Sequence, residues 1–304
     1  MACWGAVLAV GLLVGFTNAA KMRVSDKRDI GDLIRRVLQC QRPVLGSVHP
    51  LHKSSTATSS ELTLLHVIAS ILHRRLPELV SEYQEPYTSS ALHNYYFQTG
   101  ELLRLLCADG NDRVPHDIVD AQGNTALNSF INVFATGGYR FRPECFATML
   151  RDQMRILDYL VSGADGNFIN IQNERGRAPL HSLIGYWQDT ATGCGMAALD
   201  CSLGTLGSIV SDMIRAGAST EVQDGNGDTA LHLIARAAVS AFRGSGSRED
   251  EEAHKQMWVE KLIRPMVAAI RIQNNWEERP VDLVDDVPGL ETIRDALDPR
   301  RYGY

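Results

Sequence analysis

Three histidines recur at the same place in a repeated pattern. They are His66, His181 and His232, and each directly follows a leucine that comes two residues after a Thr or Ala. Imidazole nitrogens bind metals and transfer protons, so a repeated histidine is the first place to look for chemistry. These three, however, lie about one repeat apart along the chain, too far apart to share an ion. The spacing favours a structural role and predicts no metal site.

The sequence motifs of common enzyme classes are missing. We find no G-x-S-x-G, no P-loop, no G-x-G-x-x-G after a strand, no H-E-x-x-H and no paired C-x-x-C. His254, Cys145 and the dispersed carboxylates have no spacing that distinguishes a site from a solvated surface. The sequence therefore predicts neither an enzyme nor a cofactor. The net charge of −6 and the lack of interleaved basic and aromatic residues argue against a nucleic-acid partner.

The first twenty residues differ from the rest of the chain. Residues 4–16 are uncharged and apolar or glycine, and small residues at Thr17 and Ala19 permit cleavage after Ala19. This run is short for a bilayer core of ~30 Å but suits a signal peptide. We expect residues 1–20 to be a signal peptide and the cleaved protein to be secreted, with no membrane association. The alternatives are a cytoplasmic chain in which this segment is a buried helix, or a gene-model artefact.

The cysteines leave the compartment open. Cleavage would remove Cys3 and leave an odd number, without the paired spacing of a disulfide framework. Cys194 and Cys201 are close enough in sequence to form a local bridge in an oxidising compartment. Equally, all of them would be reduced in the cytosol.

A turn pattern repeats four times in register. An acidic or amide residue stands three residues before Gly123, Gly176, Gly227 and Glu277, and five residues before Thr125, Ala178, Thr229 and Arg279. A threonine at the second of these places suits a helix N-cap, and Pro179 suits the first turn of a helix. Gly163 and Gly217 follow apolar helical residues, as glycines that end helices do. Each repeat is therefore predicted to be a turn followed by two helices.

This pattern of turn and helix residues resembles the ankyrin repeat. The family pattern D-x-x-G-x-T-P-L-H, with G-A after the second helix, is matched closely at 213–235, well at 159–184 and partially elsewhere. The resemblance implies an all-α helical solenoid with short β-hairpin-like turns, in which the repeated histidines bond to the backbone of the neighbouring repeat. It covers residues 55–300 as four or five repeats, preceded by an N-terminal helix and connector at 21–54.

The repeats are longer than the family pattern. Their opening positions are separated by 62, 53, 51 and 50 residues (125−63, 178−125, 229−178 and 279−229), whereas ankyrin repeats have about 33. We place the additional residues in insertions between the two helices, at 135–150, 188–207 and 240–257. The third is expected to be a disordered, solvated linker because of its Gly-Ser run and the acidic run 249–252. The first carries a candidate contact patch at 139–142.

The resemblance also implies a non-catalytic protein-protein interaction module, in which the turns and first helices form a concave binding face. Trp276 is the strongest candidate because a large aromatic side chain at a turn is costly to expose. The alternatives are a secreted, toxin-like effector, an intracellular adaptor and a structural solenoid without a dedicated partner. The residues predicted to contact a partner are Glu174, Arg175, Arg177, Asp224, Asn226, Asp228, Asn275 and Trp276. Those predicted to carry the repeat signature are Thr125, Pro179, His181, Thr229 and His232.

Overall fold

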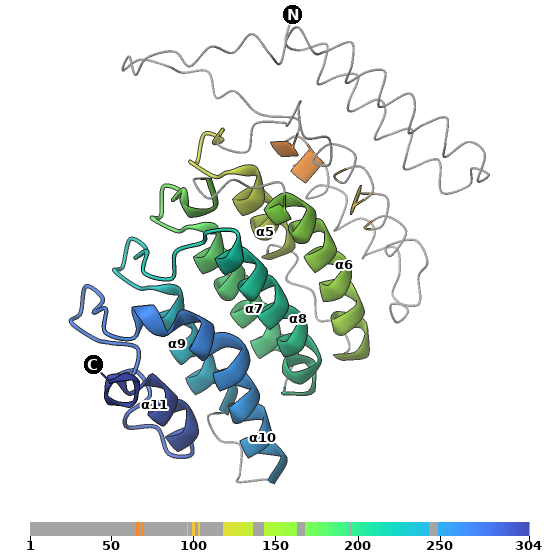
Figure 1. Cartoon of the computed structure of the whole chain (residues 1–304). Helices are drawn as coiled ribbons and strands as arrows, with labels where there is room; N and C mark the ends of the chain where they lie inside the picture. Colours follow the sequence, from red (N-terminus) through yellow and green to blue (C-terminus); the bar gives the residue numbers. More distant parts are fainter. Residues whose placement is uncertain are drawn as a thin grey trace, which may run out of the picture.

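The computed structural model describes most of the chain from residue 118 onward as two layers of helices. The described residues are 118–135, 143–162, 168–194, 196–242 and 249–303, with residues 65, 66, 68, 69, 96, 99, 100 and 103. One layer holds α5 (Ala126–Ala135), α7 (Pro179–Cys194) and α9 (Ala230–Phe242), and the other holds α6 (Pro143–Ser162), α8 (Met196–Arg215) and α10 (Glu249–Trp258). Figure 1 shows the pairs stacked side by side, with the turns between pairs projecting together at the left.

The packing confirms the all-α solenoid that the sequence predicts. α5 packs against α7 and α7 against α9, while α6 packs against α8, so each helix contacts its counterpart in the next repeat. The described residues contain no strand, only a single antiparallel bridge between Val119 and Thr125. Helix α8 ends at Arg215, and Gly217, with a φ of 102°, follows it as the expected C-terminal cap. The N–H of Gly217 donates to Ile214 O at 3.0 Å and that of Ala218 to Met213 O at 2.9 Å.

The additional residues at 188–207 lie where the sequence places them, but they lengthen two helices and do not form a loop. α7 continues to Cys194 and α8 begins at Met196, leaving one residue between them. Glycine, threonine and serine in this stretch have low helix propensity and suggested a loop. Packing overrides propensity here, since Leu203 and Leu206 are fully buried on the inner face of α8.

The other two predicted insertions are also partly helical. Residues 143–150 form the start of α6, which begins at Pro143, a residue suited to a first helical turn. The acidic run 249–252 opens α10, where negative charge is favoured by the helix dipole, and is not a solvated linker. Glu251 lies 3.0 Å from Lys255 one turn later, and both are buried. The candidate contact patch at 139–142 and the Gly-Ser run lie outside the described residues, as do residues 1–64.

An aromatic cluster ties the layers together at the C-terminal half of the solenoid. Trp187 of α7 packs on Trp258 of α10 with ring centres 5.0 Å apart, and Phe242 of α9 meets the same ring at 5.5 Å. All three side chains are buried. Trp187 therefore belongs to the core between helices.

The last repeat departs from regular helix geometry. After α10 the chain passes through a π-helical turn, η3 (Val259–Ile263), into a 3-10 helix, η4 (Arg264–Ala269). Pro265 explains the change, since it has no N–H to donate to the preceding turn. The chain then forms the last turn and ends in α11 (Glu291–Leu297) and η5 (Pro299–Tyr302), with α11 packed on α10.

Candidate functional site

Four tight turns project from the solenoid, and we call them tips one to four; the first three precede α5, α7 and α9, and the fourth follows η4. They span residues 120–125, 173–178, 224–229 and 274–279. In each tip, Oδ1 of the leading Asp or Asn accepts hydrogen bonds from the backbone N–H groups two and four residues later, at 2.8 to 3.1 Å. Such side chains mimic a turn of backbone and hold the chain in place. The leading residue is thus committed to the turn itself.

The fourth residue of each tip has a positive φ. It is Gly123, Gly176 and Gly227 in the first three tips, with φ between 70° and 76°. A Cβ at Gly176 would lie 2.5 Å from the backbone nitrogen of Gly225, and one at Gly227 would lie 2.6 Å from that of Asn275. The left-handed backbone conformation favours glycine at these two positions, and the close approach of the neighbouring tip requires it. In tip four the residue is Glu277, with φ of 62°, and no further tip follows within the described part of the chain.

Hydrogen bonds join successive tips into a ladder. The backbone N–H of the second residue of each tip donates to the carbonyl of the third residue of the tip before it, at 3.0 to 3.1 Å, for Glu174, Gly225 and Asn275. A second ladder comes from glutamines just before the tips. The side-chain amides of Gln172 and Gln223 donate both to their own tip and to the backbone of the next glutamine, Gln223 and Gln273, at 2.6 and 2.7 Å.

Side chains also pair across each tip boundary in one fixed register. The fifth residue of a tip meets the leading residue of the next: Asn173 Nδ2 donates to Asn124 Oδ1 at 3.0 Å, and Arg177 Nε lies 3.7 Å from Asp224 Oδ2. At the last boundary, Asn274 Nδ2 donates to Asp228 Oδ1 at 3.0 Å. Each pair is chemically complementary, so these residues hold neighbouring repeats in register.

The repeated histidines connect the repeats behind the tips. Each Nε2–H donates to the carbonyl just before the opening residue of the next repeat: His66 to Asn124, His181 to Asp228 and His232 to Glu278, at 2.9 to 3.0 Å. Asn128 takes the place of the histidine in its repeat and reaches the carbonyl of Arg177 at 3.5 Å. The sequence analysis missed this asparagine, although its place in the register would have found it.

His181 and His232 differ in the surroundings of their second ring nitrogen, Nδ1. His232 Nδ1 lies 2.8 Å from the hydroxyl of Thr229, whereas His181 Nδ1 is buried without a hydrogen bond because Ala178 replaces that threonine. Desolvation lowers the pKa of both rings, against the opposing effects of Asp224 on His181 and of the Glu278 carbonyl on His232. Both rings are thus neutral framework residues near neutral pH.

The side chains left over for a ligand are those at the third position of each tip. Gln122, Arg175, Asn226 and Trp276 are exposed there, and none of their side chains makes a hydrogen bond within the described residues. The tip positions that bond within or between tips hold nearly the same residue type in every tip. The third position changes from amide to cation to amide to aromatic. Such a variable position is suited to recognising one particular surface.

The predicted partner-contacting residues divide into two groups. Glu174, Arg175, Asn226, Asn275 and Trp276 are exposed, and Arg177 is half-buried. Asp224 and Asp228 are buried and bonded within the framework, which corrects their assignment as partner-contacting residues. The residues of the repeat signature, namely Thr125, Pro179, His181, Thr229 and His232, are all buried.

One arginine that the sequence analysis did not single out joins this surface. Arg236 of α9 forms a two-point ion pair with Asp228, with Nη2 2.9 Å from Oδ1, and its guanidinium lies over the Trp276 ring, 5.9 Å from the centre. Burial alone would raise the pKa of Asp228, but hydrogen bonds from Arg236 and Asn274 outweigh it and lower the pKa. Asp228 is therefore a fixed negative charge.

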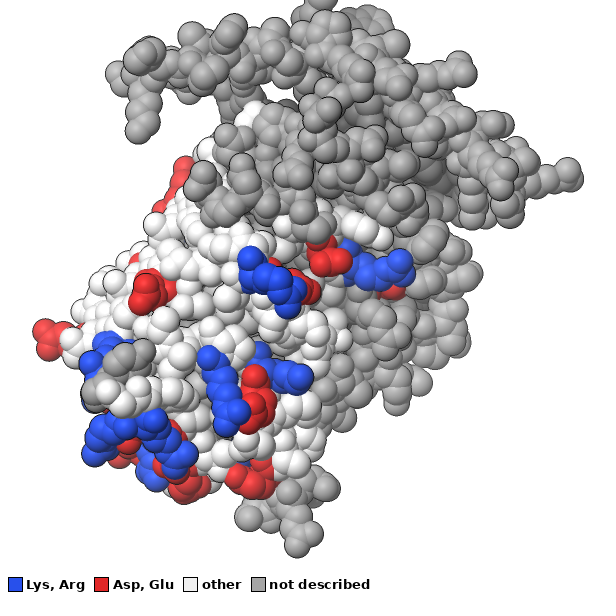
Figure 2. Space-filling model, in the orientation of Figure 1, with Lys and Arg blue, Asp and Glu red and all other residues white. Residues whose placement is uncertain are grey.

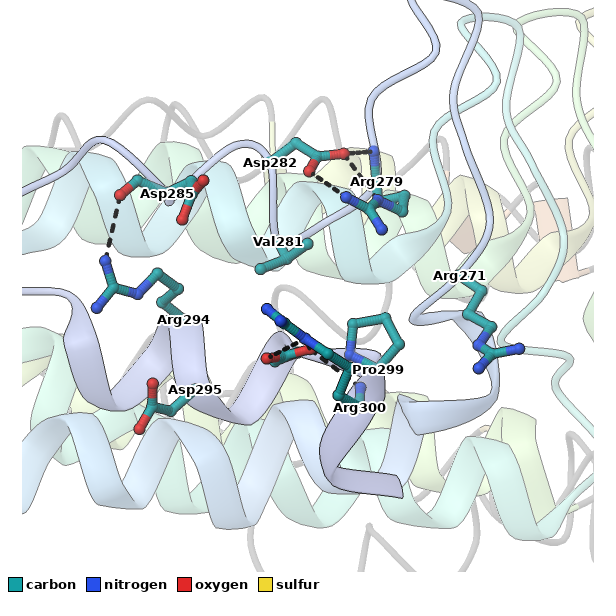
Figure 3. A pocket seen from close by; sticks show the side chains of 10 residues that line it. Arg271, Arg279, Val281, Asp282, Asp285, Arg294, Asp295, Pro299 and Arg300 are labelled. Carbon is teal, nitrogen blue, oxygen red and sulfur yellow. Dashed lines mark hydrogen bonds and ion pairs between the residues drawn. The ribbon is translucent and has the colours of Figure 1, made fainter. Parts of the chain in front are cut away.

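A charged cavity of about 830 Å³ lies beside the last repeat. Figure 3 shows arginine and aspartate side chains around it, from the turn after tip four, from α11 and from η5. Arg279 bonds to Asp282 at 2.8 Å and Arg300 to Asp298 at 3.0 Å, so much of its charge is internally paired. The cavity thus presents alternating charges with no excess that would select one small ligand.

The remaining described surface gives no sign of a metal or membrane site. Figure 2 shows acidic and basic side chains intermixed over the outer helices, with uncharged surface between them. Among the described residues no three His, Cys, Asp or Glu side chains are grouped so that they could hold a metal ion. No described helix is both long enough and apolar enough to cross a bilayer.

No protein-family model matches the chain, and no curated protein matches it in sequence. Among solved structures, EF0377, an ankyrin repeat protein, is similar over 69% of this chain and 98% of its own length, at 19% identity and a TM-score of 0.27. The ankyrin repeat domain of Bcl-3, a member of the IkappaB protein family, covers 78% of this chain and 100% of its own, at 18% identity and a TM-score of 0.25. These TM-scores are too low to support an argument. The resemblance to divergent ankyrin-like repeats depends instead on the tips, the helix pairs and the histidine bonds described above.

Proposed function

We propose that this chain is a non-catalytic protein-interaction module whose partner binds along the tips and the adjoining surface of the first helices. The observation that carries the proposal is that most residues of each tip make bonds within the solenoid, whereas the third residue does not. The leading residues and glycines form the turns, and the histidines bond to the next repeat. The third residue stays exposed, and its chemistry varies from Arg175 to Asn226 to Trp276. A rigid scaffold that presents variable side chains favours recognition of another protein.

The buried ionisable groups support a non-catalytic role. His181, His232 and Asp228 have the burial and shifted pKa values that often mark active sites. Each of them, however, bonds to the backbone or to a side chain of the neighbouring repeat. Structural networks shift pKa values in the same way, and here the geometry accounts for all three groups.

Site-specific photo-crosslinking tests the proposal. A photoreactive residue is placed at Asn226 on tip three or, as the matched control, at Ser208 on the exposed outer face of α8, and crosslinking is carried out in extract of the native source. We expect a distinct protein adduct from position 226 that Arg175→Glu and Trp276→Ala each reduce. Adducts that are equal at both positions, or insensitive to both substitutions, would count against binding at the tips.

The compartment of this interaction depends on the N-terminal segment. We propose secretion after cleavage of residues 1–20, because their apolar run and small residues fit a signal peptide. Mass spectrometry of the native protein tests this: a mature N-terminus at Ala20 in the extracellular fraction supports a secreted effector. An intact Met1 in cytosol supports an intracellular adaptor, and no adduct in either fraction favours a structural solenoid.

A further inference from the structure

Trp276 is the most exposed large apolar side chain of the described residues. It is 60% exposed, against 36% for Val119, and it occupies the third position of tip four. Exposing an indole to water is unfavourable in free energy, and isolated tryptophans at projecting turns often anchor an interface. Its surroundings indicate the chemistry of what it would contact.

Hydrogen bonds hold the backbone of Trp276, and one cation contacts its ring. The backbone N–H of Trp276 donates to Asn274 Oδ1, and Asn274 Nδ2 donates to Asp228 Oδ1, both at 3.0 Å. Asp228 pairs with Arg236, whose guanidinium lies over the indole ring. The side chain is 60% exposed beside Arg236, and we call the ring surface that Arg236 does not cover the open face.

The two residues after Trp276 are acidic. Asp228 neutralises Arg236, but within the described residues no lysine or arginine pairs with Glu277 or with Glu278, whose Oε2 accepts only from Asn274 Nδ2 at 3.1 Å. Residues 274–289 carry five carboxylates and a single basic side chain, Arg279, which is bonded to Asp282. An exposed indole attracts organic cations, and acidic residues next to it in sequence add to that attraction.

We propose that tip four binds a positively charged, extended segment of the partner protein, with a Lys or Arg side chain on the open face of Trp276. Glu277 and Glu278 provide the counter-charges, and Arg236 holds the ring. This inference rests on the proposed function, because it specifies the partner's chemistry at one end of the same row of tips. Tip two, where Arg175 balances Glu174 and Arg177 lies 3.7 Å from Asp224, has no excess of negative charge and does not share this preference.

Peptide binding to the full chain tests the inference directly. Fluorescent peptides of one Gly/Ser backbone carry Lys, Arg, Glu or Ser at the same spaced positions, and binding is followed by anisotropy at about 0.15 M ionic strength. We expect the Lys and Arg peptides to bind roughly tenfold more tightly than the Ser peptide. Trp276→Ala should remove this preference, and Trp276→Phe should retain part of it. Equal or tighter binding of the Glu peptide would overturn the inference.

The carboxylates are tested with a matched charge control. The double substitution Glu277→Gln and Glu278→Gln keeps the acceptor oxygen that Asn274 uses and should reduce the Lys peptide's affinity to that of the Ser peptide. The double control Glu252→Gln and Glu260→Gln likewise removes two charges, from exposed side chains of α10 and η3 that pair with Lys255 and Arg264, and should leave affinity unchanged. Equal losses in the two variants would mean that only net charge matters and would overturn the local site.

Quenching of Trp276 fluorescence gives a readout that needs no peptide. The signal is taken as the difference between the wild-type chain and Trp276→Phe, which isolates this indole. Caesium should quench it more strongly than iodide, and the double glutamine variant should remove the difference. Stronger quenching by iodide would overturn the inference. If crosslinking at position 226 succeeds while peptides and quenchers show no charge preference, only the cationic partner is rejected and the proposed function stands.

Discussion

Tips three and four have the same internal hydrogen bonds and differ in what lies on their outer side. Tip three is covered by tip four, whose Asn275 N–H bonds to Asn226 O at 3.0 Å, so its fourth residue is Gly227. Tip four has no covering tip in the described chain, and its fourth residue is Glu277 in the same left-handed conformation. The turn therefore accepts a side chain, and the neighbouring tip is what excludes one.

The largest expected effect comes from adding a side chain under a covering tip. Gly227→Ala should lower the free energy of unfolding by about 3 kcal/mol, because left-handed strain of ~1–2 kcal/mol adds to the forced separation of two tips and the loss of ladder hydrogen bonds. Gly289→Ala is the matched control, since its φ is 84° but no atom lies within 4 Å of the added Cβ. It should show the strain alone in denaturant unfolding. Equal losses in both variants would mean that the covering tip contributes nothing.

Acid should weaken the boundaries between repeats through the buried histidines. The pKa values of His181 and His232 are lowered in the folded chain, so the unfolded chain binds more protons. Their contribution to stability is fully present above the ordinary histidine pKa of about 6.5 and is lost as pH falls below it. Denaturation at a series of pH values should show this decline, and the double variant His181→Asn, His232→Asn should flatten it, following Asn128. An unchanged slope in that variant would assign the decline to other groups.

A smaller effect distinguishes the two histidines. Ala178→Thr should raise the free energy of unfolding by about 1 kcal/mol, because the hydroxyl would satisfy the buried Nδ1 of His181 as Thr229 does for His232. Ala178→Val, which has the same shape without the hydroxyl, controls for packing and should give no gain. Matching thermal midpoints for the Thr and Val variants would contradict this account.

The smallest expected effect completes the comparison at tip four. Glu277→Gly relieves left-handed strain but adds freedom to the unfolded chain, so stability should change by less than about 1 kcal/mol. A loss of several kcal/mol would show that the Glu277 side chain supports the fold. In that case the contrast with Gly227 would not come from stacking.

Much of the fold followed from the register of a few residues. The fourfold spacing of Asp120, Asn173, Asp224 and Asn274 predicted four turns, each followed by a helix. The structure has all four turns and the first three helix starts, whereas after Arg279 the chain forms further turns and no helix begins before α11 at Glu291. The additional length of the repeats was placed correctly at 188–207, but its helical conformation was not predicted, because Gly, Thr and Ser there have a loop-like composition. Helix formation there depends on burial of Leu203 and Leu206 against other repeats, which local propensity does not report.

The candidate site was only partly predictable for a related reason. Polar residues at turns were taken as ligand contacts, and this was right about the exposure of Arg175, Asn226 and Trp276. Asp224 and Asp228 look the same in sequence but are buried, since each is bonded to a residue about one repeat away. The glutamine ladder was visible as a recurrence at 172, 223 and 273, but its partners were not.

The amino-acid sequence by itself determined the repeat register, the left-handed glycines and the starts of the first helices, because these depend on interactions within a few residues. Only the tertiary structure decided which polar side chains of the tips remain for a partner. That choice depends on hydrogen bonds between residues some fifty positions apart, such as Asn274 with Asp228 at a separation of 46, which form only when one repeat stacks on the next. It leaves the Trp276 side chain exposed at the last of the described tips.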